Sequence, residues 1–377
     1  MRLCLSIVGA AVLLAGCGSA GAPTRRQALI VVARGLANPR QISVGPDGAL
    51  YVAEAGDGGH ARCATDPSTG GRICVGASGA IARVTHAVVT RIVSGLPSVA
   101  GSGGSESSGP ADVILSHRHP VFVIQDTQID RAGANQFGEP GRLLGSLISA
   151  QTSGGLRVIA DLARFEAAHN PDHGAGAASA ADGIDSDPYS LAAYRGGYAL
   201  ADAAGNDLLW ISASGAIRVL AVFPVQHEIA APGVVAKSAR RVTVQSVPTS
   251  VAVGPDGALY VGELTGFPFD PGYARVWRVV PGHAPTVYAR GFTNISAIAF
   301  DRGGRLEINR AGLRDTTAPG ELIRVAGGRR TLLASAGLSW PTGVAVAADG
   351  SIFVANNGIS PASGHGSHGE IVRVLTR

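Results

Sequence analysis

One eight-residue string occurs twice in this chain. Gly-Pro-Asp-Gly-Ala-Leu-Tyr-Val runs from Gly45 to Val52 and again from Gly254 to Val261. The proline sets the φ angle needed at the second position of a tight turn, and the aspartate and glycine let the chain reverse. Residues typical of strands stand on both sides of the turn. The string therefore predicts a β-hairpin used more than once, which points to a repeat architecture.

Weaker copies of this hairpin occur at 113–123, 191–200, 300–306 and 346–354. A second marker precedes the first strand of each unit by about three residues. It is a proline in five units and Ile295 in the sixth; the prolines are Pro39, Pro110, Pro188, Pro248 and Pro341. Six such units predict an all-β fold, a six-bladed β-propeller.

The ends of the chain predict how the ring closes. Residues 30–36 have the pattern of an outermost strand, but no inner strands precede them. The last unit, which ends at 370–374, lacks an outermost strand. We expect the N-terminal strand to complete the last blade, because closure removes two exposed sheet edges. Residues 29–377 are then expected to form one domain.

The N-terminus has the features of a signal peptide. Arg2 precedes an apolar run at 3–15, which matches a signal-peptide core and is too short for a membrane span. The sequence Leu-Ala-Gly before Cys17 resembles a bacterial lipobox. It predicts a signal peptide at 1–17, lipidation of Cys17, a flexible tether at 18–28 and an exported protein anchored in the cell envelope. The alternative is an ordinary signal peptide with an incidental cysteine.

Beyond the signal peptide, Cys63 and Cys74 are the only cysteines. Export permits disulfides, so we expect these two to pair and close the glycine-rich insertion at 56–76. A zinc site is less favoured, because no Cys-x-x-Cys motif and no paired histidines lie nearby.

Aligning the units on their turns places a polar residue at the end of each second strand. These residues are Glu54, Gln125, Asp202, Glu263 and Asn356, with either Glu307 or Arg310 in the fifth unit. One hypothesis is a ring that binds a cation or a polar ligand. The favoured interpretation is local: each side chain satisfies backbone amides of the following turn, since a turn is needed in every unit and a ligand site only once.

Two loops offer further candidates. Asp182, Asp185 and Asp187 precede the third unit and could hold Ca²⁺, although their spacing misses the EF-hand pattern. A solvated loop is the simpler interpretation. Phe267 and Phe269 flank a proline and predict a contact loop, unless they seal the blade against the body. The sequence predicts no cofactor. Ca²⁺ is the only bound ion that these loops suggest.

The composition argues against several functions. Charged residues make up 15% of the chain and the net charge is +4, without the clusters of Lys and Arg that bind nucleic acid. No Gly-x-Ser-x-Gly nucleophile motif and no Gly-Lys-Ser/Thr phosphate loop occurs. No catalytic residue is predicted.

Three stretches, 39–56, 170–207 and above all 246–294, resemble the ScyD/ScyE family of exported propellers, which are related in shape to NHL-repeat proteins. The resemblance covers 30–374, and 262–269 is its most specific part. It implies a six-bladed propeller with no established reaction and no catalytic set. The chain departs from the family at Leu306-Glu307-Ile308, which directly follows the fifth turn.

These features together predict a lipid-anchored envelope propeller. One face would bind a protein or a small molecule, and only the lipid would contact the membrane. The alternative is a metal-dependent hydrolase or lactonase, or a sugar dehydrogenase. Such an enzyme would need several ring carboxylates to converge on one ion in the channel.

Overall fold

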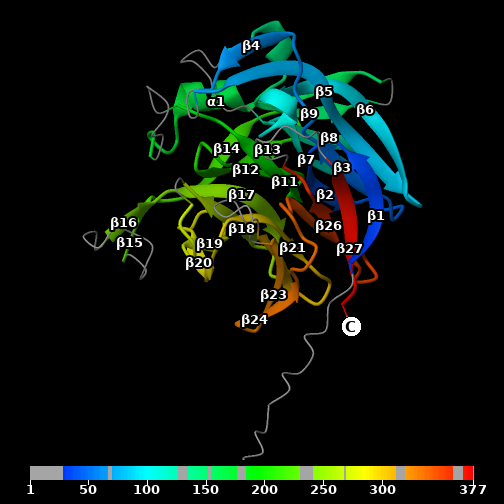
Figure 1. Cartoon of the computed structure of the whole chain (residues 1–377). Coiled ribbons are helices and arrows are strands. Elements are labelled where there is room, and N and C mark those ends of the chain that lie inside the picture. Colours follow the sequence, from blue (N-terminus) through cyan, green and yellow to red (C-terminus); the bar gives the residue numbers. More distant parts are fainter. Residues whose placement is uncertain are drawn as a thin grey trace, which may run out of the picture.

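The protein is a six-bladed β-propeller, as the sequence predicts. The computed structural model describes residues 29–66, 70–125, 135–151, 154–175, 184–229, 241–266, 269–310, 319–359 and 368–376. Its blades surround a central axis (Figure 1).

The main strands of the first five blades run from the axis outwards in chain order, and in blade 6 the N-terminal β1 is outermost. Blade 1 has β2 (Pro39–Val44), β3 (Leu50–Glu54), β5 (Arg72–Thr85) and β6 (Val88–Ala100), with β4 (Arg62–Thr65) beside the first half of β5; blade 2 has β7 (Pro110–Ser116), β8 (His119–Ile124), β9 (Ser146–Ala150) and β10 (Leu156–Asp161); blade 3 has β11 (Pro188–Tyr194), β12 (Gly197–Asp202), β13 (Asp207–Ser212) and β14 (Ile217–Val222).

The second half of the ring repeats this order. Blade 4 has β17 (Ser246–Val253), β18 (Leu259–Thr265), β19 (Ala274–Val279) and β20 (Thr286–Phe292); blade 5 has β21 (Ile295–Phe300), β22 (Leu306–Arg310), β23 (Glu321–Ala326) and β24 (Arg329–Ala334); blade 6 has β25 (Gly343–Val346), β26 (Ile352–Asn356), β27 (Gly369–Val374) and β1 (Leu29–Leu36).

The ring closes through the N-terminal strand. β1 pairs antiparallel with β27, from Leu29 opposite Val374 to Leu36 opposite Gly369. The first and last described strands therefore lie in the same blade, side by side in Figure 1. This confirms the predicted closure.

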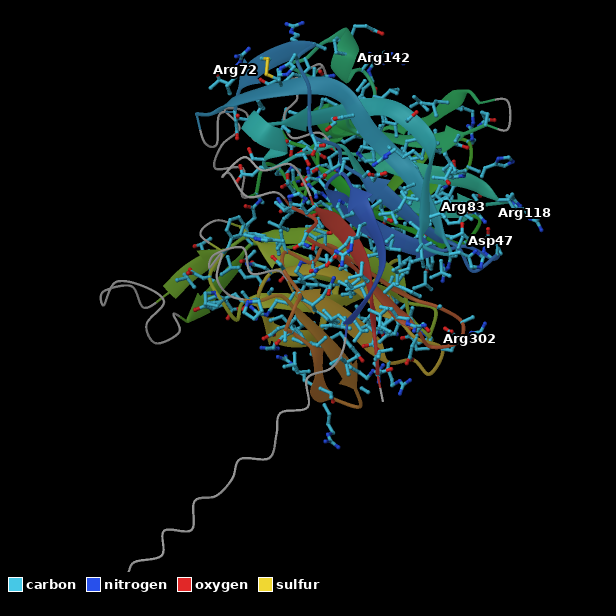
Figure 2. The ribbon with its side chains drawn as sticks, turned by 45° about the vertical axis from the view of Figure 1, so that its right-hand side comes forward. Asp47, Arg72, Arg83, Arg118, Arg142 and Arg302 are labelled. Atoms are coloured by element: carbon cyan, nitrogen blue, oxygen red, sulfur yellow. A yellow bond between two sulfur atoms is a disulfide. The ribbon has the colours of Figure 1, made fainter. Side chains whose placement is uncertain are left out.

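The repeated octapeptide forms the turn between the two innermost strands of blades 1 and 4. Its aspartate side chain accepts a hydrogen bond from the backbone amide two residues later in the chain. In blade 1, Asp47 accepts this bond from the Ala49 amide at 3.2 Å. The same carboxylate pairs with an arginine of the third strand: Asp47 with Arg83 at 2.8 Å and Asp256 with Arg278 at 2.7 Å. Figure 2 shows Asp47 and Arg83 close together at one edge of the molecule. The turn therefore ties three strands of its blade together.

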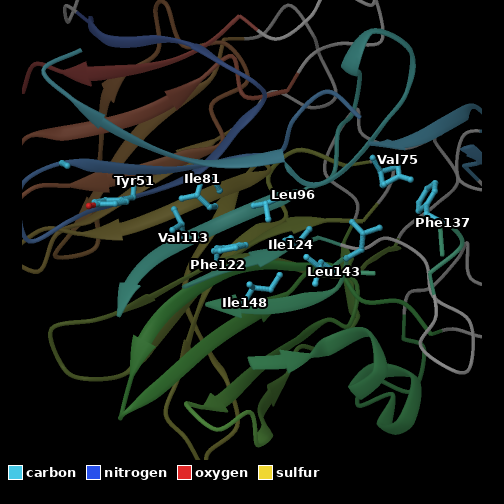
Figure 3. Packing of buried hydrophobic residues seen from close by; sticks show 14 residues of the cluster. Tyr51, Val75, Ile81, Leu96, Val113, Phe122, Ile124, Phe137, Leu143 and Ile148 are labelled. Carbon is cyan, nitrogen blue, oxygen red and sulfur yellow. The ribbon is translucent and has the colours of Figure 1, made fainter. Parts of the chain in front are cut away.

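Apolar residues fill the space between neighbouring blades. The buried hydrophobic residues fall into six clusters, one at each blade interface. In Figure 3, Ile81 and Leu96 of blade 1 face Val113, Phe122 and Ile148 of blade 2. Burying such side chains contributes about 25 cal/mol per Å² of apolar surface, so packing between blades is the main stabilisation of the ring.

The two faces of the propeller differ. In an antiparallel blade, the connections between strands one and two and between strands three and four leave from one face, which we call the turn face. The other connections leave from the opposite face, which we call the loop face. The loop face carries β4, the helix α1 (Leu162–His169) and the hairpin of β15 (Gln226–Ile229) and β16 (Arg241–Val244). The large insertions that the structure describes are thus gathered on one face.

We expect removal of β1 to disrupt the ring. Deleting residues 1–36 leaves blade 6 with three strands and exposes the edge of β27, whereas deleting residues 1–28 removes no described strand. The shorter deletion should unfold cooperatively and run as a monomer in size-exclusion chromatography. The longer deletion should aggregate or lose its cooperative thermal transition. Equal behaviour of the two deletions would contradict a closing role for β1.

Candidate functional site

Three of the predicted ring residues hold the chain segment that leads into their own blade. Glu54 Oε2 accepts the Ala37 amide at 2.7 Å, and Asp202 Oδ1 accepts the Asp187 amide at 2.7 Å. Asn356 Oδ1 accepts the amide of Ser339 at 2.7 Å. In each case the bonded amide lies one or two residues before the blade's first-strand proline. These contacts satisfy backbone amides, but of the segment before the blade rather than of the following turn that the sequence predicted. Asp202 also accepts the following-turn amides of Ala204 and Gly205.

Glu263 has different partners. Its Oε2 accepts the Trp277 indole N–H at 2.6 Å, and its Oε1 lies 3.3 Å from Arg275 Nε. Burial raises the pKa of the Glu263 carboxyl to about 7, against the opposing effect of these donors. Arg275 also pairs with Glu228 of β15 at 2.7 Å. Glu263 therefore belongs to a network that ties the β15–β16 hairpin to blade 4.

The strand registers settle two other positions. In blade 2, Ile124 lies opposite Pro110, so Gln125 is one residue past the ring position, where its Nε2 donates to Asp187 Oδ1 at 3.0 Å. In blade 5, Arg310 lies opposite Ile295 and occupies the ring position. Glu307 lies in mid-strand and pairs with Arg324 at 2.7 Å.

A circle of hydrogen bonds around the axis joins the blades, and the sequence reasoning missed it. It uses residues one and two places after the proline marker of each unit. Thr249 Oγ1 donates to the Ile295 carbonyl at 2.6 Å, Ser296 Oγ to the Pro341 carbonyl at 2.8 Å, and Thr342 Oγ1 to the Pro39 carbonyl at 2.7 Å. These bonds join blades 4 to 5, 5 to 6 and 6 to 1.

The remaining interfaces complete the circle. Ser190 Oγ accepts the Val251 amide at 3.2 Å and donates to Asp112 Oδ2 at 3.0 Å, which joins blades 4, 3 and 2. The guanidinium of Arg40 donates to the Ser107 carbonyl, in the connection from blade 1 to blade 2. The available signal was the small polar residue that directly follows Pro248, Ile295 and Pro341.

Two side chains of blade 1 fill the axis. Gln41 Nε2 donates to the carbonyls of Thr249 at 3.3 Å and Ser296 at 2.9 Å, on blades 4 and 5 across the ring. Arg40 is buried and donates to the carbonyls of Asn38 and Gly358. Burial lowers the pKa of the Arg40 guanidinium. The axis at this level is therefore occupied by the protein's own polar groups.

The described aspartates of the predicted Ca²⁺ loop do not come together at one site. Asp182 lies outside the described residues, so its prediction stands untested. Asp185 and Asp187 lie on the connection into blade 3, and Asp187 contacts Gln125 rather than joining Asp185 around one point. Near this connection the structure gathers four buried carboxyl groups that sequence reasoning missed in part: Glu166, Asp172, Asp202 and Asp207.

The other predicted contacts have mixed outcomes. Cys63 and Cys74 lie opposite each other on β4 and β5 and form a disulfide, which confirms that prediction. Phe269 is half-buried in a left-handed conformation, with φ of 61°, and its amide donates to the Gly266 carbonyl. Phe267 and Cys17 lie outside the described residues, and their roles remain predictions.

Within the described part of the chain, no three His, Cys, Asp or Glu side chains are arranged to hold a metal ion. The described helices include none of the length and apolar character needed to cross a bilayer.

Comparison with known proteins identifies the fold. No protein-family model and no curated protein sequence matches the chain. A solved glucose dehydrogenase is 13% identical over 93% of this chain and 100% of its own, with a TM-score of 0.52. A structure of unknown function from Bacteroides thetaiotaomicron is 8% identical over 92% of this chain and 75% of its own, with a TM-score of 0.51.

Virginiamycin B lyase from Staphylococcus aureus is 13% identical over 93% of this chain and 99% of its own, with a TM-score of 0.47. Such low identities establish the architecture and nothing finer. The chain has the fold of the six-bladed propeller proteins.

Asp112 predicts a pH dependence of stability. Burial raises its pKa to about 7 in the folded protein, whereas an unfolded aspartate titrates near 3.9. Between these values the folded state keeps a proton that the unfolded state releases, so the unfolding free energy falls as pH rises, by up to about 1.4 kcal/mol per pH unit.

We expect Asp112→Asn to reduce this slope. The variant should lose less stability than the wild type in urea unfolding between pH 4.5 and pH 7. Asp349→Asn changes an exposed turn residue of blade 6 and is the control. An unchanged slope in Asp112→Asn would show that Asp112 is ionised throughout this range.

Proposed function

We propose that this protein is a lipid-anchored envelope propeller of the ScyD/ScyE type. In this proposal the loop face binds a protein or a small molecule, and no reaction is catalysed in the channel. The observation that carries the proposal is the collection of cross-linked insertions on that one face. Binding residues are often placed on loops that a rigid scaffold positions.

The insertions are held by specific contacts. The disulfide closes the β4–β5 extension, and the Arg275–Glu228 pair fixes the β15–β16 hairpin. Asn38 Nδ2 donates to the carbonyls of Gly56 at 2.8 Å and Gly104 at 3.2 Å, which joins two neighbouring loops. Loops fixed in this way lose little conformational freedom when they bind.

The contacts at the ring and the axis favour binding over metal-dependent catalysis. The carboxylates of Glu54 and Asp202 accept backbone amides, and Glu263 accepts Trp277. The buried side chains of Gln41 and Arg40 lie at the axis of the ring. A metal-dependent hydrolase or lactonase, or a sugar dehydrogenase, is the second candidate, since a glucose dehydrogenase shares the fold. Metal-dependent turnover of a lactone or a sugar that is lost in Glu263→Gln would favour that candidate.

Paired charge reversals on the two faces test the binding face. Arg72 and Arg142 are exposed near the disulfide, whereas Arg118 and Arg302 are exposed at the opposite side with Asp47 (Figure 2). Each pair replaced by glutamate changes the net charge equally. Immobilised wild type and the turn-face variant should capture the same molecules from solubilised envelopes, and the loop-face variant at least fivefold less. Equal capture by all three proteins, or loss in the turn-face variant alone, would contradict the proposal.

The lipid anchor has its own test. Cys17→Ser should move the protein from the membrane fraction to the soluble extracytoplasmic fraction, because one acylated cysteine supplies the attachment. Cys4→Ser, within the apolar run, should leave the distribution unchanged. Mass spectrometry of the mature N-terminus reads the modification directly. Unaltered membrane association of Cys17→Ser would reject the lipobox.

A further inference from the structure

We propose that Glu166, Asp202 and Asp207, with Asp172 beside them, form a site for a hard divalent cation of the Ca²⁺ type on the loop face of blade 3. Glu166 comes from α1, Asp202 from the end of β12 and Asp207 from the start of β13. Asp172 lies in the loop after α1. The site is away from the axis and differs from the Asp182, Asp185 and Asp187 set that the sequence suggested.

All four carboxyl groups are buried. Their exposed fractions are 3% for Glu166, 7% for Asp172, 2% for Asp202 and 1% for Asp207. In the described part of the chain, no ion pair joins any of the four to a lysine or an arginine. Several uncompensated negative charges in one buried region are strongly unfavourable.

Two of the carboxylates meet beside a glycine. A Cβ atom placed on Gly205 would lie 3.4 Å from both Asp202 Oδ1 and Glu166 Oε2. Two side-chain oxygens, one from α1 and one from blade 3, therefore lie on the same side of Gly205, where no side chain separates them.

Asp207 supplies the independent evidence for a ligand. Both of its carboxylate oxygens are buried and have no hydrogen-bond partner, and Glu166 Oε1 is also unpartnered. Buried polar groups are normally paired, so these oxygens are the ones that a cation would satisfy. Asp207 lies directly opposite Asp202 where β12 pairs with β13, which places it beside the other carboxyl groups.

The titration behaviour agrees with this geometry. Burial, followed by the neighbouring carboxylates, raises the pKa of Glu166 to about 8. The same causes raise the pKa of Asp207 well above its ordinary value. A bound cation would offset this repulsion between the carboxylates. With oxygen donors only, the site suits Ca²⁺ rather than a metal that prefers nitrogen or sulfur ligands.

The oxygens already engaged indicate which groups would move. Asp202 Oδ1 accepts the amides of Asp187, Ala204 and Gly205, and its Oδ2 accepts the Ser186 hydroxyl at 2.7 Å. Asp172 Oδ2 accepts Asn206 Nδ2 at 2.6 Å. No three acidic side chains of the described residues yet surround one point. Glu166 and Asp207, which have unpartnered oxygens, would turn towards Asp202 to coordinate the ion. Coordination would fasten α1 to blade 3.

Calcium titration of the full chain in detergent tests the site, with isothermal calorimetry and thermal unfolding as readouts. The wild type should bind one Ca²⁺ per chain and melt several degrees higher in CaCl₂ than in EDTA. Asp207→Asn should bind at least tenfold more weakly. In EDTA it should be at least as stable as the wild type, because a buried repelling charge is gone. Glu166→Gln should also weaken binding, and the control Asp349→Asn should bind like the wild type.

Two results would overturn the proposal. One is a folded wild type that neither binds Ca²⁺ nor changes its melting temperature between CaCl₂ and EDTA, which would mean that protons alone neutralise the cluster. The other is an equal calcium response of the wild type, Asp207→Asn and Glu166→Gln, which would place the ion elsewhere. Partner capture by the loop face is a separate measurement, so either proposal can fail alone.

Discussion

The ring depends on how the innermost strands meet at the axis. Each innermost strand is the edge of its sheet, so its free backbone groups need partners in the next blade. Side chains directly after the proline marker provide them, as Thr249, Ser296 and Thr342 do for the carbonyls of the following blades. The proline itself fits this edge because it has no N–H to leave unpaired. Outside the axis, the six apolar clusters complete the same interfaces.

Closing the ring in this way determines where ligands can bind. The polar groups at the axis, including Gln41, are bonded to neighbouring blades, and the ring residues Glu54 and Asp202 hold blade connections. In this structure these polar residues make contacts within the scaffold. The loop face carries the fixed insertions and the buried group of carboxylates around Asp207. Both proposals therefore concern that face.

The comparison between sequence and structure is clearest at the ring. Turn chemistry located most strand ends correctly, because five-residue turns such as 45–49 and 254–258 recur with the same spacing. In blade 2 the register places Ile124 opposite Pro110, one residue before the predicted Gln125. Blade 5 could not be assigned from the sequence, and the strand register selects Arg310.

The sequence alone determined the hairpin repeat, the number of blades, the closing strand and the Cys63–Cys74 pair. These follow from turn residues, strand patterns and spacing, which act over short stretches or recur regularly along the chain. Only the tertiary structure brought Gln41 across the axis to Ser296 and gathered Glu166 with Asp202 and Asp207. Those contacts join segments whose separation in the chain follows no period, so they arise from packing of the blades and α1 rather than from any local pattern.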